Sequence, residues 1–360
     1  MKFTTDASRV LICVTVLLLV GFCGCGREKP QSQYLTICSY GGAFQDAQRA
    51  AYFEPFTKAT GIEIREASYG GEYAKIKLMV ESGNIEWDLV DIESDMLLRG
   101  AKAGLYEPID YAVVDKNDLV GEGAHRYGVA SDLFSSALAY STDAFPKGKE
   151  PKDWADFWDT ERFPGPRSLR RDPRSTLEFA LLADGVEPEK LYPLDVDRAF
   201  ASLDRIRPSI TVWWTSGHQP SELLASGEVV LASSFSARIW VASIKDEKPM
   251  AFTFNQALID PEWWITPRGC EKKALAMQFI AFASRAENQA NFPEHIGLGP
   301  SNPKALELIE PALARQLNTH PDNFTQQIFV DAAWWAENYA SVQKRWLAWI
   351  VGSNASVPKE

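Results

Sequence analysis

The chain has 360 residues, with 37 Lys or Arg against 48 Asp or Glu, and its formal net charge at pH 7 is -11. Such an acidic chain is a poor candidate for nucleic-acid binding, because that affinity comes largely from Lys and Arg on phosphates. The length exceeds one average hydrophobic core and suits two lobes. The acidity agrees with a cationic ligand but does not establish one, since surface acids also promote solubility.

Residues 1–25 are expected to be a targeting signal outside the fold. A basic start precedes the apolar run 10–22, which is too short to span a bilayer. Residues 22–25, Phe-Cys-Gly-Cys, resemble a bacterial lipoprotein signal in which Cys25 carries the lipid. Residues 26–33 then read as a short polar tether. The prediction is a periplasmic protein anchored to a bacterial membrane through lipid, and an ordinary signal peptide without lipid is the alternative.

A strand, a glycine turn, a helical stretch and a second strand are predicted between residues 34 and 69. Parallel pairing of the two strands is expected, because parallel strands need a crossover of a dozen or more residues. The turn at Tyr40, Gly41 and Gly42 stands at the carboxyl end of the first strand. Ligands lie at such strand ends in open α/β sheets, so these three residues are candidate binding residues.

A second strand-to-helix turn follows the predicted strand 87–92 and precedes the predicted helix 95–102. It places Glu93 and Ser94 near the first turn, so that the two turns form half of a cleft. A structural role is the alternative, because serine caps helices and an acid favours the positive end of a helix. The two roles are compatible.

Several motifs occur in a fixed order along the chain. They are Ser-Tyr-Gly-Gly at 39–42, Trp-Asp-Leu-Val-Asp-Ile-Glu-Ser at 87–94, Leu-Leu-Ala-Ser-Gly-Glu-Val-Val-Leu at 223–231, Trp-Trp-Ile-Thr-Pro-Arg-Gly at 263–269 and Ala-Met-Gln-Phe-Ile-Ala-Phe-Ala-Ser-Arg at 276–285. Through these motifs the chain resembles the substrate-binding proteins of bacterial ABC importers of the polyamine type, the spermidine/putrescine-binding family.

The resemblance implies an α/β, two-lobed periplasmic binding protein fold (type II-like) with a hinge between the lobes. Lobe 1 is expected at 34–130 and again at 251–315, lobe 2 at 131–250, and C-terminal helices at 316–360. A small amine-bearing ligand and the membrane subunits of an ABC permease are the implied partners. We expect a monomer that needs no cofactor or metal.

The family carries an acid near the turn before the predicted helix 175–183, and Asp172 matches that position. Arg170 and Arg171 beside it depart from a simple cation site. They are solvated, paired with Asp172, or placed to receive an anionic group, and the sequence does not rank the last two.

Two further candidates follow predicted strands. Trp213 and Trp214 end the strand 210–214, where side chains alternate, so at most one reaches the cleft, and Trp214 is nearer the strand end. An indole face attracts an ammonium group, although a core position is the alternative. Arg238 follows the next strand and could clamp a carboxylate or phosphonate through its planar fork, with a salt bridge as the alternative.

The family also places an aromatic residue and an acid just before the final strand, and Asp260, Glu262 and Trp263 match this region. Two carboxylates beside an aromatic ring would neutralise an ammonium that leaves water, which is costly unless it is paired. Trp264 is expected in the core. Cys38 and Cys270 allow a disulfide in an oxidising compartment, and a buried free thiol at Cys38 is the alternative.

Known catalytic signatures are missing from the sequence, which has no Gly-x-Ser-x-Gly elbow, His-Glu-x-x-His, P-loop or dinucleotide fingerprint. The histidines are scattered and the spacing of Cys and His gives no zinc site. A binding protein that is not an enzyme is therefore predicted, with a secreted envelope hydrolase as the alternative of another class.

The main interpretation is a solute-binding protein that captures a polyamine such as putrescine or spermidine between two lobes. The alternative within the binding class is an amine-bearing zwitterion or anion, such as an opine, an amino acid derivative or an aminophosphonate. Arg170, Arg171 and Arg238 favour that alternative.

Overall fold

The computed structural model describes residues 33–116, 119 and 123–354. The predicted signal peptide 1–25, the lipid-bearing Cys25 and all but the last residue of the tether lie outside the described residues. Among the helices that are described, none is long and apolar enough to cross a membrane.

The chain begins with parallel strands, as predicted. β1 (Tyr34–Ser39) pairs in parallel with β2 (Glu63–Ser68) and with β3 (Leu89–Glu93). The crossover between β1 and β2 is one long helical segment made of α1 (Gly42–Gln48), a π-helical turn (Arg49–Phe53) and α2 (Glu54–Thr60). The helices α3 (Tyr73–Ser82) and α4 (Ser94–Lys102) flank β3.

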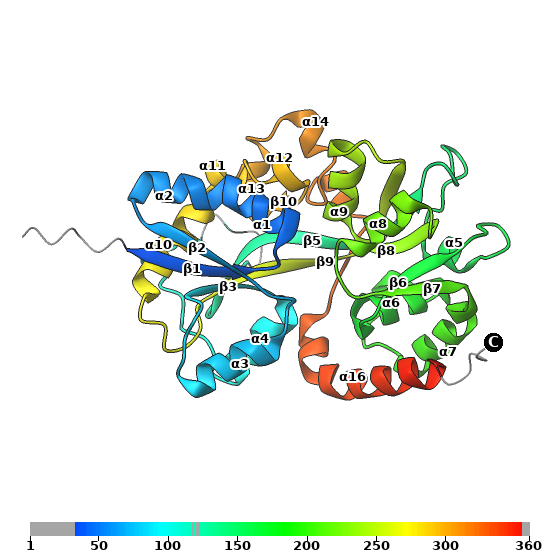
Figure 1. The fold of residues 1–360 in the computed structure, drawn as a ribbon, viewed down its shortest axis with the longest axis horizontal. Coiled ribbons are helices and arrows are strands. Elements are labelled where there is room, and N and C mark those ends of the chain that lie inside the picture. The colour runs from blue at the N-terminus through cyan, green and yellow to red at the C-terminus, as the bar shows by residue number, and fades with distance from the viewer. Residues whose placement is uncertain (1–32, 117–118, 120–122, 355–360) are drawn as a thin grey trace, which may run out of the picture. The chain divides into compact units, whose positions relative to one another are not determined.

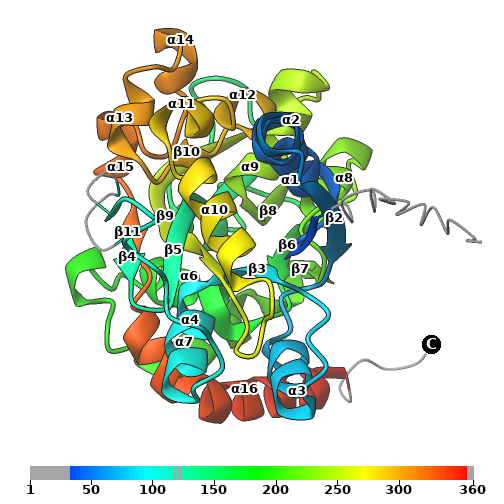
Figure 2. The same cartoon turned by 90° about the vertical axis from the view of Figure 1, so that its left-hand side faces the viewer.

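Helices cover both faces of this end of the sheet (Figures 1 and 2). α1, α2 and α10 (Lys273–Ala283) form one core with β1, in which Leu35, Phe56 and Phe279 are fully buried. α3 and α4 form a second core on the opposite face, with Cys38 and Ile76. The alternation of side chains along β1 therefore supplies both cores.

Two long antiparallel strands, β5 (Gly128–Ser141) and β9 (Met250–Ile265), run through the middle of the sheet. The strand order is β2-β1-β3-β9-β5-β8-β6-β7. Beyond β5 the sheet continues with β8 (Leu231–Phe235), β6 (Arg167–Arg170) and β7 (Ile210–Trp214), in which β6 is parallel to both its neighbours. Each end of the sheet is thus a parallel α/β unit, and β5 and β9 connect the two units (Figure 1).

The remaining helices surround this frame. They are α5 (Trp154–Trp158), α6 (Pro173–Ala183), α7 (Val196–Ile206), α8 (Gln219–Ser226), α9 (Ser236–Trp240), α11 (Ala286–Gln289), α12 (Pro293–Ile296), α13 (Pro303–Leu306), α14 (Pro311–Ala314), α15 (Pro321–Phe324) and α16 (Ala332–Asn354). The short strands β4 (Ala124–His125) and β10 (Gly299–Pro300) pair with β5, and β11 (Ile328–Phe329) pairs with β9.

The last helix, α16, packs against both α4 and α6 and lies along one side of the molecule (Figure 1). Its Trp335 and Trp346 are buried in a large aromatic core with Trp154 and Phe179. Trp264, which the sequence analysis placed in the core, is also buried.

Both described cysteines, Cys38 and Cys270, are free and buried. The disulfide allowed by the sequence is therefore not formed in this structure. Burial raises the pKa of each thiol to about 12, which keeps both protonated and unreactive at neutral pH.

A buried carboxyl group ties α16 to α6. The Tyr192 hydroxyl and the Trp335 indole N–H both donate to Glu178 Oε1, at 2.7 and 2.6 Å. Because the side chain is completely buried, the pKa of Glu178 rises to about 7.

We expect Glu178→Gln to remove a pH-dependent loss of stability. The pKa in the folded protein lies above the ordinary value of 4.5, so the folded state binds this proton more tightly than the unfolded chain. The contribution is complete below the ordinary pKa and is lost as the pH rises towards 7, by about 3 kcal/mol. Denaturant unfolding at pH 5 and at pH 8 measures this loss of stability, because the first pH lies about 2 units below the raised pKa and the second about 1 unit above it.

The matched control is Glu337→Gln, which removes an exposed carboxylate from α16, the helix that carries Trp335. It should leave the pH dependence of the wild type unchanged. An identical loss of stability between the two pH values in wild type and Glu178→Gln would show that this carboxyl group is not the source.

Candidate ligand-binding site

A cavity of about 540 Å³ opens where the carboxyl ends of strands from the two α/β units face each other. The β1–α1 turn and β9 supply one wall, and β7, β8 and α9 supply the other. The cavity is lined by six aromatic side chains, Tyr40, Phe44, Tyr69, Phe134, Trp214 and Phe235, and by five charged ones, Glu93, Arg170, Arg238, Asp246 and Glu262.

The structure brings together most, but not all, of the residues predicted from the sequence as binding residues. Ser94, Asp172, Asp260 and Trp263 do not line this cavity. Those that do are Tyr40, Gly41, Gly42, Glu93, Trp214, Arg238 and Glu262.

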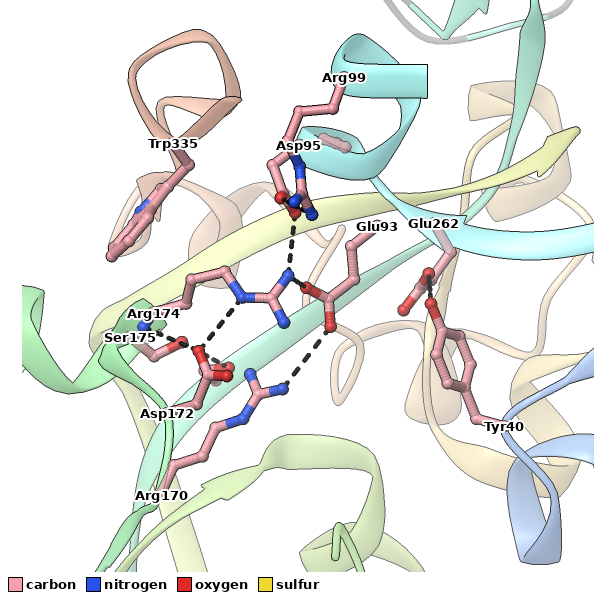
Figure 3. A network of polar contacts seen from close by, with 12 residues as sticks. Tyr40, Glu93, Asp95, Arg99, Arg170, Asp172, Arg174, Ser175, Glu262 and Trp335 are labelled. Carbon is pink, nitrogen blue, oxygen red and sulfur yellow. Dashed lines mark hydrogen bonds and ion pairs between the residues drawn. The ribbon is translucent and has the colours of Figure 1, made fainter. Parts of the chain in front are cut away.

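Glu262 is a buried carboxyl group in the cavity wall. It is 6% exposed, and the Tyr40 hydroxyl donates to its Oε2 atom at 2.9 Å (Figure 3). Tyr40 is itself held by stacking on Tyr69, with ring centroids 5.5 Å apart. No Lys, Arg or His among the described residues lies within ion-pair distance of Glu262.

Burial and the nearby carboxylates of Asp91, Glu93 and Asp132 raise the pKa of Glu262 well above its ordinary range, while the hydrogen bond from Tyr40 opposes the rise. Glu93 lies close to Glu262 because the two residues are directly opposite each other on the paired strands β3 and β9. Glu262 is therefore poised to gain from a positively charged group that enters the cavity.

Asp91 and Asp132 form a buried acidic pair that the sequence analysis did not identify. Ser131 Oγ lies 3.3 Å from a carboxylate oxygen of Asp91 and 3.2 Å from one of Asp132, and Gln48 donates to Asp91 at 2.7 Å. Burial raises the pKa of Asp91 to about 7. The available signal was an aspartate within the apolar strand Leu-Val-Asp-Ile, where a buried polar side chain needs a partner.

Arg238 lines the cavity from α9, directly after β8. Among the described residues, no carboxylate lies within ion-pair distance of its guanidinium. Burial lowers the pKa of Arg238, but arginine remains charged in proteins. Gly42 faces this guanidinium, and its φ of +56° is the feature that favours glycine, because a Cβ atom there would make only an ordinary contact of 3.5 Å with Arg238 Nη1.

Trp214 forms the wall beside Arg170. Its indole N–H donates to Ser233 Oγ at 3.1 Å, and the guanidinium of Arg170 lies 5.8 Å from the indole and 5.3 Å from the Phe235 ring. Trp213, the preceding residue, points to the opposite face and packs on tryptophans of α16. The alternation along β7 thus sends one tryptophan to each face, as expected.

Arg174 occupies the centre of an ionic network beside the cavity (Figure 3). Its guanidinium contacts Glu93, lies 2.9 Å from Asp95 and 3.2 Å from Asp172, and packs on the Tyr339 ring at 5.3 Å. Asp172 also caps α6 by accepting the backbone N–H of Arg174 at 3.0 Å. Sequence reasoning missed Arg174 and considered only the two preceding arginines as partners of Asp172.

The other three predicted residues also lie outside the cavity. Trp263 points away from Glu262 and is buried, and its indole N–H donates to Ser94 Oγ at 2.8 Å. Ser94 in turn donates to the Pro261 carbonyl at 3.2 Å. Asp260 is buried beyond Arg174, in a small space of about 20 Å³.

No group of three or more His, Cys, Asp or Glu suited to a metal ion occurs in the described part of the chain. The side chains that line the cavity offer hydrogen bonds, aromatic faces and charges of both signs.

The family model for bacterial extracellular solute-binding proteins matches residues 51–322. The chain belongs to this family. A γ-aminobutyric acid-binding protein from Pseudomonas aeruginosa is 40% identical over 339 residues, which cover 92% of this chain and 95% of that protein.

Solved structures agree with this family membership. An ABC transporter substrate-binding protein from Bradyrhizobium japonicum is 41% identical with a TM-score of 0.84, covering 88% of this chain and 99% of its own. The protein AgtB from A. tumefaciens R10, in complex with agropinic acid, is 39% identical with a TM-score of 0.81, covering 89% and 99%. These neighbours are two-lobed periplasmic solute-binding proteins, so the predicted α/β fold class is confirmed.

The resemblance to the polyamine-binding group is more distant than the sequence analysis implied. A spermidine/putrescine-binding protein from Haemophilus influenzae is 22% identical over 300 residues, covering 79% of this chain and 80% of that protein. The solute-binding role is therefore supported at the level of the family, which is not a family of enzymes, and the alternative ligand class fits the relatives better than polyamines do.

Proposed function

We propose that this chain is the extracytoplasmic solute-binding protein of an ABC importer and that its solute is a small zwitterion carrying an amine and a carboxylate. One observation carries the proposal. Of the charged side chains that line the cavity, Arg170 and Glu93 lie 3.7 Å apart and Asp246 is exposed. The guanidinium of Arg238 and the buried carboxyl group of Glu262 have no ion-pair partner among the described residues.

Each end of such a solute has a chemical counterpart in the cavity. Arg238 offers a planar fork that matches a carboxylate, and Glu262 with the Tyr40 hydroxyl offers acceptors for an ammonium group. Pairing is required at both ends, because a charge that leaves water unpaired costs several kcal/mol. The aromatic walls then cover the apolar carbons between the two charged groups.

The similarity to proteins named for γ-aminobutyric acid and agropinic acid supports the same ligand class. A polyamine is the second candidate, favoured by the buried acids Asp91 and Asp132 behind Glu262. It fits less well, because a second ammonium group would face Arg238. Export to the periplasm, lipid attachment at Cys25 and delivery by a monomer to the permease remain proposals from the sequence.

We expect γ-aminobutyrate or an opine to stabilise the protein lacking residues 1–25 in a thermal-shift screen. A ligand at about 100 times its dissociation constant adds about 2.7 kcal/mol to the folded state, which is a readable shift. The panel includes putrescine and spermidine at the same concentrations. Stabilisation by the polyamines alone would contradict the proposal and return the assignment to a cation site.

We expect Arg238→Gln and Glu262→Gln each to weaken binding of the zwitterion at least about tenfold, because each removes one ionic contact from a partly or fully buried charge. Isothermal titration calorimetry measures the loss. Asp246→Asn is the matched control, since Asp246 also lines the cavity but is exposed to solvent. An unchanged affinity in either of the first two variants would remove that residue from the site.

We also expect binding to release protons and to strengthen as the pH rises. The pKa of Glu262 is raised in the empty cavity, and an ammonium group beside it favours the ionised form, so binding lowers that pKa. Titrations in two buffers of different ionisation enthalpy reveal the released protons as a difference in heat. The difference should be smaller in Glu262→Gln, and a heat that does not depend on the buffer in the wild type would contradict this coupling.

A further inference from the structure

We propose that Arg174 determines which class of amine the site accepts, by neutralising Glu93 and so leaving Glu262 as the carboxyl group available to an ammonium. This inference rests on the proposed function. It concerns a residue that does not line the 540 Å³ cavity and acts through another side chain, so Arg174 is a positioning residue.

The backbone around Arg174 is built to direct its side chain at Glu93. Pro173 and Arg174 begin α6, but Arg174 has an extended conformation (φ -63°, ψ 138°) and Ser175 has φ +68°. A non-glycine residue in this left-handed region costs of order 1 kcal/mol and persists where surrounding contacts require it. In Figure 3 the Arg174 side chain extends from this turn to Glu93 and Asp95, on the far side of the cleft.

The charges around Arg174 balance one another. Three acids, Glu93, Asp95 and Asp172, surround its guanidinium. Two further arginines complete the cluster, with Arg99 2.8 Å from Asp95 and Arg170 3.7 Å from Glu93. The side chain of Arg174 is only 13% exposed, so solvent screens these contacts little. Glu93 therefore lines the cavity without offering an unpaired negative charge.

Glu93 and Glu262 would otherwise make a site for two cations. They face each other across β3 and β9, and both line the cavity. A diamine needs an anionic partner for each ammonium group that is buried. With Glu93 already paired to Arg174, Glu262 is the buried carboxyl group of the cavity lining that stays available to an ammonium. Together with the guanidinium of Arg238 it suits an amine with a carboxylate, and Arg238 repels a second ammonium.

The test compares affinities for γ-aminobutyrate and putrescine by calorimetry in the wild type and Arg174→Gln. Loss of the guanidinium leaves Glu93 with only its longer contact to Arg170, at 3.7 Å, so the ratio of putrescine affinity to γ-aminobutyrate affinity should rise at least about tenfold. Two control variants keep a positively charged side chain beside Glu93. Arg174→Lys keeps a positive charge there, and Arg99→Gln removes one from Asp95 but not from Glu93, so both should keep the wild-type ratio within about threefold.

A second variant decides the question where Arg174→Gln does not fold, as judged by its thermal melt. The double variant Arg174→Gln with Glu93→Gln removes one charge of each sign and keeps the cluster balanced. It should bind γ-aminobutyrate within about threefold of the wild type, and a loss of about tenfold would show that Glu93 itself holds the amine and overturn the inference.

The two proposals fail in different ways. A wild type that binds putrescine and not γ-aminobutyrate or an opine contradicts the proposed function. A wild type that binds the amino acid, together with a folded Arg174→Gln variant whose ratio is unchanged, contradicts only the role of Arg174.

Discussion

A charge taken out of water must be compensated inside the protein, and the arrangement around Arg174 is how this chain meets that requirement. One guanidinium is shared by three carboxylates from the β3–α4 turn and the start of α6, and it rests on an aromatic ring of α16. These parts of the chain lie far apart in the sequence. Because the guanidinium and the carboxylates neutralise one another, they connect these parts of the chain and leave little net charge for a solute to interact with.

The alternation of side chains along the strands then determines which residues line the cavity. β5 and β9 run through both α/β units, and β9 carries Glu262 into the cavity while the next residue, Trp263, turns into the core. β7 repeats the rule with Trp214 in the cavity and Trp213 against α16. The period of two along a strand is therefore the device that separates binding side chains from packing ones.

The local features of the fold and site could be predicted from the sequence, because turn chemistry and alternation are local. The β1 turn with Tyr40, the strand 210–214 and the choice of Trp214 over Trp213 are examples. The network of Arg174 could not be predicted, since its partners Glu93 and Asp95 lie 81 and 79 positions away. A glutamate in a sequence looks the same whether it is free or paired, so the acids agreed with the polyamine ligand that the family resemblance implied.

The proposed pairing of a zwitterion with Arg238 and Glu262 has a kinetic consequence. The chain as a whole is strongly acidic, with a net charge of -11, and such a surface draws cations in from a distance while salt weakens the attraction. A solute whose own charges cancel feels little of that long-range field. If the proposed ligand class is right, capture depends on orientation within the cavity rather than on electrostatic steering, and the rate of association changes little with ionic strength.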